Sequence, residues 1–299
     1  MLENFDQLLS KLGKQKKKKI VVAMAQDIEV LLSLEKAQYE GLADATLVGS
    51  KSELQKIARE NKFDLSAYEI IDLYDEKSCI DTAVKMVRQG EAQVLMKGLC
   101  STKLFLKGIL DKETGLRSSS ILSHLAIFES PAYHKLILMS DAAMNIAPDL
   151  DEKIAIINNA VNAALSLGYE RPKVAVLSAV EKVNAAGMPS SVDAAIISKM
   201  AERGQIKNAI IDGPLAVDNA LSEHANLVKN LQSPVGGDTD ICIVPNIESG
   251  NIFYKLLTIL GQAKVAGIVL GAQAPIILTS RADSEESKFL SIATALLIS

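Results

Sequence analysis

The stretch ILSHLAIFESPAYHKLILMS, residues 121–140, contains two apolar runs separated by a short polar connection. ILSHLAIF (121–128) and KLILMS (135–140) each have the length of a buried strand, and ESPAYH between them carries no helical pattern. Elsewhere in the chain, strand patterns alternate with helical ones. The break therefore indicates a change of sheet, and we predict a domain boundary near residue 130.

On both sides of this stretch, β-branched runs alternate with helical patterns. Further strands are predicted at 20–25, 45–49, 68–72, 93–98, 173–179, 208–213, 240–245, 266–271 and 275–280. Most are continuous apolar runs, so helices should cover both faces of their sheets. Asp27 is expected to open a helix over 28–40, and Gly168 to end one over 150–167. The fold class is α/β with mainly parallel sheets.

The last strand and helix are predicted to return to the first domain. This gives a first α/β domain of residues 1–129 plus 270–299 and a second of residues 130–269, each with three layers. A cleft between two such domains is a preferred place for a ligand.

Composition limits the function. The 299 residues are 48% hydrophobic and 23% charged, as in a soluble globular protein. Aromatic residues make up only 4%, tryptophan is absent and the net charge is −4, so no nucleic-acid partner is expected. The basic run KQKKKK (14–19) is predicted to solubilise the entrance to a strand. No apolar run reaches membrane-spanning length and the start is amphipathic, so we expect a cytoplasmic protein with no membrane partner.

Metal and disulfide patterns are missing from the sequence. The three cysteines and three histidines are scattered, without zinc spacing or an evident metal triad. The P-loop, the dinucleotide-binding glycine motif and the G-x-S-x-G elbow are also absent. Cys100 follows a predicted strand, and we interpret it as a small buried residue, not as a nucleophile.

Polar clusters follow several predicted strands at their carboxyl ends, where open α/β sheets bind ligands. Each cluster is a weak signal because Asp, Asn and Ser also cap helices. The candidate binding residues from these clusters are Lys97, Gly98, Ser101, Asp212, Gly213, Pro214, Asn246, Gly250 and Asn251.

One cluster, in ILTSRADSEESKF (277–289), combines a hydroxyl and a guanidinium at the junction of a strand and a helix. A helix N-terminus with an adjacent arginine is suited to an anion, most commonly a phosphate. In the alternative interpretation, Ser280 only caps the helix and Arg281 only pairs with Glu285.

Five strings carry a resemblance to a known family: SDAAMNIAPDLDEK (140–153), MPSSVDAA (188–195), DGPLAVDNA (212–220), PNIESGNIFYK (245–255) and LTSRADSEESK (278–288). Their order and sequence resemble the phosphate acetyl/butyryl transferase family, most closely its butyryl-transferring members. The resemblance implies a fold similar to that of isocitrate and isopropylmalate dehydrogenases, with the site in the cleft between the two domains. It implies the reaction butanoyl-CoA + phosphate ⇌ butanoyl phosphate + CoA, with acyl-CoA and inorganic phosphate as substrates and no tightly bound cofactor or metal. A homo-oligomer coupled functionally to an acyl-phosphate kinase such as butyrate kinase is also expected.

The resemblance assigns roles to individual residues. Arg281 would clamp the phosphate, and Ser280 would donate to the phosphate or to the developing oxyanion. Arg117, in TGLRSSS, resembles the region where relatives contact the phosphates of CoA; alternatively it is an ordinary loop arginine. Met188 to Ser191 form a predicted helix start that borders the site. Acetyl-specific relatives have a proposed basic aspartate six residues after the motif arginine, and Ser287 occupies that position here, which leaves the general base unassigned.

Three alternatives stay open at this point. The enzyme could act on acetyl-CoA, because acyl chains differ only by methylenes and the sequence does not reveal the pocket. A metal- and nicotinamide-dependent dehydrogenase of the isocitrate-like fold would need a carboxylate cluster, which is not evident. A non-enzymatic regulator that binds CoA or acyl phosphate would have no need of Ser280 and Arg281.

Overall fold

The computed structural model describes residues 2–278 and 283–299. In these ranges the chain forms eleven strands, and each predicted strand overlaps one of them, which confirms the α/β fold class. The chain divides into two compact units: unit 1 comprises Met1–Phe5 and Ser120–Val265, and unit 2 comprises Asp6–Ser119 and Ala266–Ser299. The two units are described separately below.

Unit 2 is built around strands in the order β3-β2-β1-β4-β11-β10. Neighbouring strands are parallel, except that β10 runs antiparallel to β11. The continuous apolar runs are buried as expected: Val21, Val22 and Leu95 are fully buried in the central strands. The strand bounds are β1 Lys18–Ala23, β2 Ala43–Gly49, β3 Glu69–Asp72, β4 Val94–Lys97, β10 Lys264–Leu270 and β11 Ile276–Ile277.

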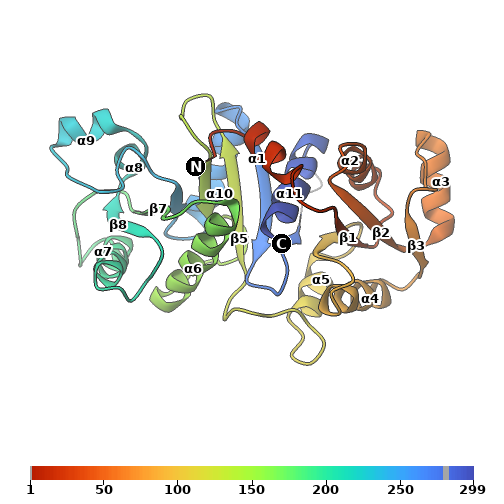
Figure 1. Cartoon of the computed structure of the whole chain (residues 1–299). Coiled ribbons are helices and arrows are strands. Elements are labelled where there is room, and N and C mark those ends of the chain that lie inside the picture. Colours follow the sequence, from red (N-terminus) through yellow and green to blue (C-terminus); the bar gives the residue numbers. More distant parts are fainter. Residues whose placement is uncertain (1, 279–282) are drawn as a thin grey trace. The chain divides into compact units, whose positions relative to one another are not determined.

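Helices cover both faces of this sheet (Figure 1). α2 (Ile28–Tyr39) packs against α11 (Glu285–Ile298) on one face, and α4 (Glu76–Arg88) packs against α5 (Thr102–Ile109) on the other. Asp27 caps α2, as predicted, by accepting hydrogen bonds from the backbone N–H groups of Glu29 and Val30. The other helices are α1 (Phe5–Leu12), which begins at the last residue of unit 1's first segment, and α3 (Lys51–Asn61).

Unit 1 has strands in the order β5-β6-β9-β7-β8. β5 is antiparallel to β6, and the remaining neighbours are parallel. The predicted change of sheet between the two apolar runs of residues 121–140 was wrong, because Ala126, Ile127 and Phe128 pair directly with Met139, Leu138 and Ile137. The strand bounds are β5 Ser123–Glu129, β6 Ile137–Ser140, β7 Lys173–Leu177, β8 Ile210–Leu215 and β9 Ile241–Ile243.

The unit boundaries lie at 119/120 and 265/266, whereas the sequence analysis divided the chain at 129/130 and 269/270. β5 accounts for the first difference, because its hydrogen bonds to β6 place it in the same unit as that strand. The division into two domains with the predicted bounds stays a prediction.

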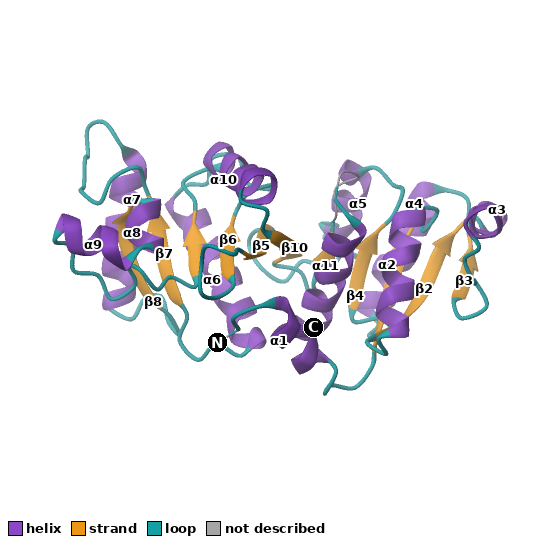
Figure 2. Ribbon diagram, turned by 90° about the horizontal axis from the view of Figure 1, so that it is seen from above, coloured by secondary structure: helices purple, strands orange, loops and turns teal. Residues whose placement is uncertain are grey.

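The helices of unit 1 lie on both faces of its sheet (Figure 2). α6 (Leu150–Leu167) contacts β5, β6 and β9, and α7 (Pro189–Glu202) contacts β7 and β8. Gly168 ends α6 in the left-handed conformation, as predicted. Alternate strand residues such as Phe128, Met139 and Cys242 form a buried cluster against which Phe253 and Tyr254 pack. The other helices are α8 (Val217–Leu221), α9 (Glu223–Lys229), α10 (Ile247–Lys255) and the π-helical η1 (Leu256–Leu260).

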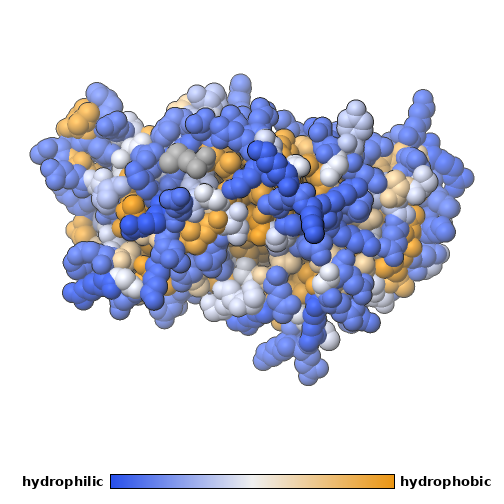
Figure 3. All heavy atoms as spheres, viewed as in Figure 1, coloured by the Kyte–Doolittle hydropathy of each residue, from blue (hydrophilic) through white to orange (hydrophobic). Residues whose placement is uncertain are grey.

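The basic run at residues 14–19 lies at the start of β1, as predicted. Lys17 pairs with Asp44 at 2.6 Å and Lys19 with Glu69 at 2.7 Å, so two of its charges are matched by carboxylates of β2 and β3. The face shown in Figure 3 is mostly hydrophilic, with apolar residues scattered among the charged ones. Among the described residues, no helix is both long and apolar enough to cross a membrane.

Candidate functional site

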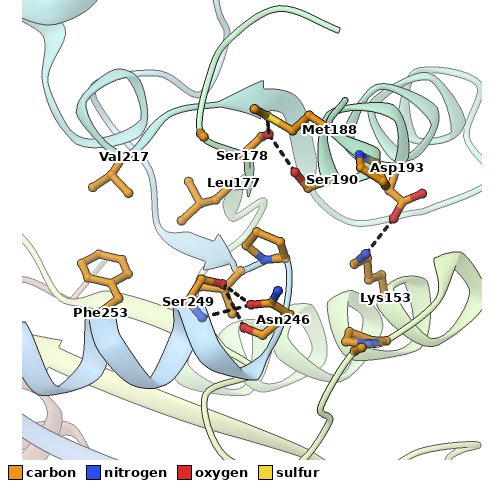
Figure 4. A pocket seen from close by; sticks show the side chains of 16 residues that line it. Lys153, Leu177, Ser178, Met188, Ser190, Asp193, Val217, Asn246, Ser249 and Phe253 are labelled. Atoms are coloured by element: carbon orange, nitrogen blue, oxygen red, sulfur yellow. Dashed lines mark hydrogen bonds and ion pairs between the residues drawn. The ribbon is translucent and has the colours of Figure 1, made fainter. Parts of the chain in front are cut away.

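Unit 1 contains a cavity of about 550 Å³ at the carboxyl ends of β7 and β9. Leu177 ends β7, and Val244 and Pro245 follow β9 directly. The beginnings of α6, α7 and α10 complete the wall, because each of these helices starts beside a strand end (Figure 4). A cavity of this size, at this edge of a parallel sheet, is of the kind that binds small organic ligands.

Local sequence explains why the three helices begin here. Asp149 and Glu152 form a reciprocal capping box at the start of α6. Asn246 caps α10 by accepting a hydrogen bond from the backbone N–H of Ser249 at 3.0 Å. α7 begins with Pro189, whose fixed φ suits the first helical position, and its N-cap Met188 makes no side-chain capping bond in the described chain.

The polar side chains of the wall are bonded to one another (Figure 4). Lys153 Nζ lies 2.6 Å from Asp193 Oδ2, and the lysine is almost completely buried. The hydroxyls of Ser178 and Ser190 lie 2.9 Å apart, and Ser178 also donates to Met188 Sδ. These bonds hold α6 and α7 at a fixed position beside the end of β7.

A buried carboxylate shapes the loop that leads into α6. Asp141, directly after β6, accepts hydrogen bonds from the backbone N–H groups of Ala143 and Met144 at 2.9 Å each. Its second oxygen accepts from the backbone N–H of His124 at 3.1 Å and from Asn145 Nδ2 at 2.6 Å. The beginning of the SDAAMNIAPDLDEK string thus has a structural role, and its later residues Ala147, Pro148 and Lys153 line the cavity.

Of the candidate residues in unit 1, the structure brings Asn246 to the cavity wall. Asp212, Gly213 and Pro214, expected in a polar cluster that follows the strand, lie within β8 itself, because β8 continues through the glycine and proline to Leu215. Asp212 accepts hydrogen bonds from Ser198 Oγ at 3.3 Å and Ser233 Oγ at 2.5 Å, which makes it a structural group in this position.

Gly250 and Asn251 lie in α10 and approach the loop after β6. A Cβ atom on Gly250 would lie 2.8 Å from the carbonyl oxygen of Asp141, so the glycine permits close contact between helix and loop. Asn251 Nδ2 donates to the carbonyl oxygen of Ala142 at 3.4 Å. Both residues therefore hold α10 against the loop after β6, and their role in ligand binding stays a prediction.

In unit 2, Lys97, Gly98 and Ser101 lie together at the carboxyl end of β4. A Cβ atom on Gly98 would lie 2.1 Å from the carbonyl oxygen of Met24, so the loops after β4 and β1 touch at this glycine. Lys97 Nζ donates to the carbonyl oxygen of Gly98 at 3.2 Å, and the backbone N–H of Ser101 donates to Glu76 Oε1. Ser101 is also the N-cap of α5.

Arg117 lies at the other end of the strands of this sheet, near the amino ends of β11 and β4. It pairs with Ala272 in an isolated β-bridge, and residue 272 belongs to the connection that leads into the amino end of β11. Since β11 is parallel to β4, this connection lies beside the start of β4 and not beside Lys97. Arg117 lines a polar hollow of about 430 Å³ with Arg88 and Lys112. Within unit 2, the predicted binding residues therefore form two separate groups.

Ser280 and Arg281 lie outside the described residues, so their assignment as phosphate ligands stays a prediction. Ser287, in the first turn of α11, donates its backbone N–H to the capping residue Ser284. Cys100 is buried, as expected, and burial raises the pKa of its thiol to about 11 despite the opposing effect of Lys97. At neutral pH it is a protonated, weakly nucleophilic group. No cluster of three or more His, Cys, Asp or Glu side chains suited to a metal is found among the described residues.

Sequence reasoning missed several cavity residues. Lys153 and Asp193 are 40 residues apart and were not recognised as a pair. Ser178 was read as part of a strand, and Phe253 was quoted only as part of a motif. From the helix start predicted to border the site, Met188, Pro189 and Ser190 line the cavity.

The fold and the cavity define an α/β protein with a cavity suited to a small ligand beyond the carboxyl ends of its strands. The chain belongs to the Phosphate acetyl/butaryl transferase family, whose model matches residues 4–82 and 76–296. It is 46% identical to the phosphate butyryltransferase of Clostridium beijerinckii, covering 100% of this chain and 98% of that one. It is 42% identical to the phosphate acetyltransferase of Thermotoga maritima, covering 97% and 98%. The crystal structure of a branched-chain phosphotransacylase from Enterococcus faecalis V583 matches with a TM-score of 0.84 at 38% identity, covering 94% and 98%.

Proposed function

We propose that the chain is a phosphate acyltransferase that catalyses butanoyl-CoA + phosphate ⇌ butanoyl phosphate + CoA. The observation that carries this proposal is that residues from four of the five family strings line one cavity. Lys153, Ser190, Val217 and Asn246 each come from a different string and a different helix or its cap. Together with membership of the family, this convergence supports acyl transfer as the activity of the chain.

The proposed chemistry is a direct attack. A phosphate oxygen forms a bond to the thioester carbonyl carbon, the C–S bond breaks, and CoA leaves as a thiolate that takes up a proton. Positioning the two reactants and stabilising the oxyanion supply most of the rate enhancement in such reactions, with about 7–11 kcal/mol available from orientation in the best cases. In this proposal, Arg281 holds the phosphate through two hydrogen bonds and Ser280 donates to the phosphate or the oxyanion.

The buried Cys100 takes no part in this scheme. Its thiol is protonated at neutral pH, so a covalent acyl-cysteine intermediate would need a base that removes its proton. Direct transfer between two bound substrates requires no acyl-enzyme. We also propose that the reaction needs no tightly bound cofactor or metal, that the protein is a cytoplasmic homo-oligomer, and that an acyl-phosphate kinase consumes its product.

Acetyl-CoA is the second candidate substrate. The similarity to the Thermotoga maritima phosphate acetyltransferase, at 42% identity over nearly the whole of both chains, is the observation that favours it. The nicotinamide-dependent dehydrogenase considered from the sequence has no such support, because the family matched by the chain consists of acyltransferases.

The activity is tested by following CoA release from butanoyl-CoA and acetyl-CoA, with and without phosphate. We expect phosphate-dependent release that survives EDTA, with the higher kcat/KM for butanoyl-CoA. Arg281→Lys tests the phosphate site, because an ammonium group does not reproduce the two-point contact of a guanidinium. Its kcat/KM for phosphate should fall about 10²–10³-fold. Unchanged kinetics in a folded Arg281→Lys protein would refute this role, and absent release by the wild type would refute the activity.

A further inference from the structure

The cavity in unit 1 has one apolar and one polar end. Leu177, Val217 and Phe253 gather on one side of it (Figure 4). The Lys153–Asp193 pair and the hydroxyl of Ser190 lie on the other side. Val217, the first residue of α8, has an apolar side chain, yet the residue is 43% exposed.

The polar end presents no net charge. Lys153 is the only cationic residue of the described cavity wall, and its ammonium group is bonded to Asp193 at 2.6 Å. Taking either partner away from this buried pair to bind a ligand would leave the other uncompensated, which is strongly unfavourable. The cavity wall therefore offers no unpaired cationic side chain to a phosphate dianion, although the N-termini of α6, α7 and α10 are turned toward it, and it can take a neutral ligand without breaking the pair.

The apolar end selects a hydrocarbon group. Val217 and Phe253 face each other across the opening, and the second of these packs on the apolar cluster of the unit. An apolar ligand between them would remove exposed apolar surface of both side chains from water. At the polar end, the hydroxyls of Ser178 and Ser190 already bond to Met188 and to each other, and the nitrogen of the Asn246 amide can donate a hydrogen bond to a neutral carbonyl group.

We infer that this cavity binds the acyl group of the acyl-CoA, with its hydrocarbon tail between Val217 and Phe253. This inference rests on the proposed function, since it names the part of that substrate that the cavity receives. The whole cavity, of about 550 Å³, is larger than the three-carbon tail of a butanoyl group, although its polar end takes up part of that volume. Branched and five-carbon acyl groups should therefore be accepted as well as butanoyl, and acetyl should be the poorest substrate because it leaves the apolar end unfilled.

Val217→Phe tests the inference by filling the apolar end. Because Val217 is partly exposed, the larger side chain displaces little packed protein. We expect kcat/KM for butanoyl-CoA and isovaleryl-CoA to fall at least about tenfold relative to acetyl-CoA, since one methylene in an apolar pocket is worth about that factor. Phe253→Leu enlarges the same end and should raise the preference for five- and six-carbon chains over butanoyl by several-fold. Ile252→Ala, on the same helix but 61% exposed and outside the cavity wall, is the matched control and should leave the chain-length profile unchanged.

The outcomes separate this inference from the activity itself. A wild type without phosphate-dependent CoA release refutes the proposed function. An active wild type, with folded Val217→Phe and Phe253→Leu proteins that keep its chain-length profile, overturns the inference alone. The reverse reaction gives a further check, because its KM for CoA should be unaffected by Val217→Phe. A KM for CoA raised equally with acetyl phosphate and butanoyl phosphate would place part of CoA in the cavity and would overturn the inference too.

Discussion

Lys135 is the most buried cation of unit 1, and its replacement by methionine should be strongly destabilising. Its ammonium group lies 2.6 Å from Asp240 Oδ1 and 2.7 Å from Asp238 Oδ1, with no exposure of the lysine side chain. Asp240 is itself 4% exposed and accepts a further hydrogen bond from the backbone N–H of Lys173 at 2.7 Å. Methionine keeps the length of the side chain but leaves the Asp240 carboxylate buried and without its cation.

Breaking a buried pair in this way costs about 3–5 kcal/mol of unfolding free energy. For a folding unit of this size the corresponding fall in Tm is about 6–20 °C. Thermal unfolding followed by circular dichroism measures it, with Lys199→Met as the control. Lys199 forms an exposed pair with Glu202 on α7, so its loss should change stability by about 0.5 kcal/mol or less.

A further measurement sharpens this prediction. Below the Tm, the KM for butanoyl-CoA should be unchanged, because Lys135 and Asp240 precede β6 and β9 whereas the cavity lies at the strands' other ends. Equal, small losses in the Lys135 and Lys199 variants would refute the reasoning.

Three other predictions follow from single sites. Cys100→Ala should keep most of the activity, because burial holds the thiol protonated at neutral pH; a butanoyl group trapped on Cys100 at the rate of turnover would contradict this. Gly98→Ala should lower the unfolding free energy by about 1–3 kcal/mol, since its Cβ would overlap the carbonyl oxygen of Met24, and chemical denaturation measures the loss. Burial raises the pKa of Asp238, but hydrogen bonds from Lys135, Lys173 and His134 outweigh it and hold that pKa well below its usual range. The stabilising contribution of Asp238 is therefore present above pH 4 and lost as the pH falls further, so Asp238→Asn should flatten the acid side of the Tm profile; an unchanged acid limb would exclude this role.

Most strands could be predicted because they are continuous apolar runs with both faces buried; β3, with its exposed Glu69 and Asp72, is an exception. Their pairing could not, since periodicity does not say which runs become neighbours. The antiparallel contact of Ala126 with Met139 is a case in point: nothing in either run distinguishes a hairpin from a change of sheet. The predicted strand over 208–213 stopped before Pro214, because glycine and proline usually end a strand. β8 tolerates them because it is the last strand of its sheet order, where a proline without an N–H removes little from the hydrogen-bond ladder.

The candidate site was predictable as a location but not as a set of contacts. The motif strings pointed to the carboxyl ends of strands, and Asn246 does line the cavity. The Lys153–Asp193 pair joins α6 and α7, whose relative position depends on the folded sheet. A local sequence pattern therefore does not predict this ion pair. Gly250, chosen as a ligand contact, also has a structural reason to be glycine in its contact with the Asp141 backbone, and its role in binding stays a prediction.

The order of strands in unit 2 has a consequence for the growing polypeptide. β4 lies between β1, which is synthesised before it, and β11, which leaves the ribosome long after it. α11, which covers α2, emerges later still. Until then, one edge of β4 and the apolar face of α2 lack their final neighbours and are exposed to incorrect association. The segments of unit 1, by contrast, have all been made once residue 265 is in place. We therefore expect unit 1 to reach its native structure during synthesis before unit 2, which cannot be completed until residues 266–299 have been made.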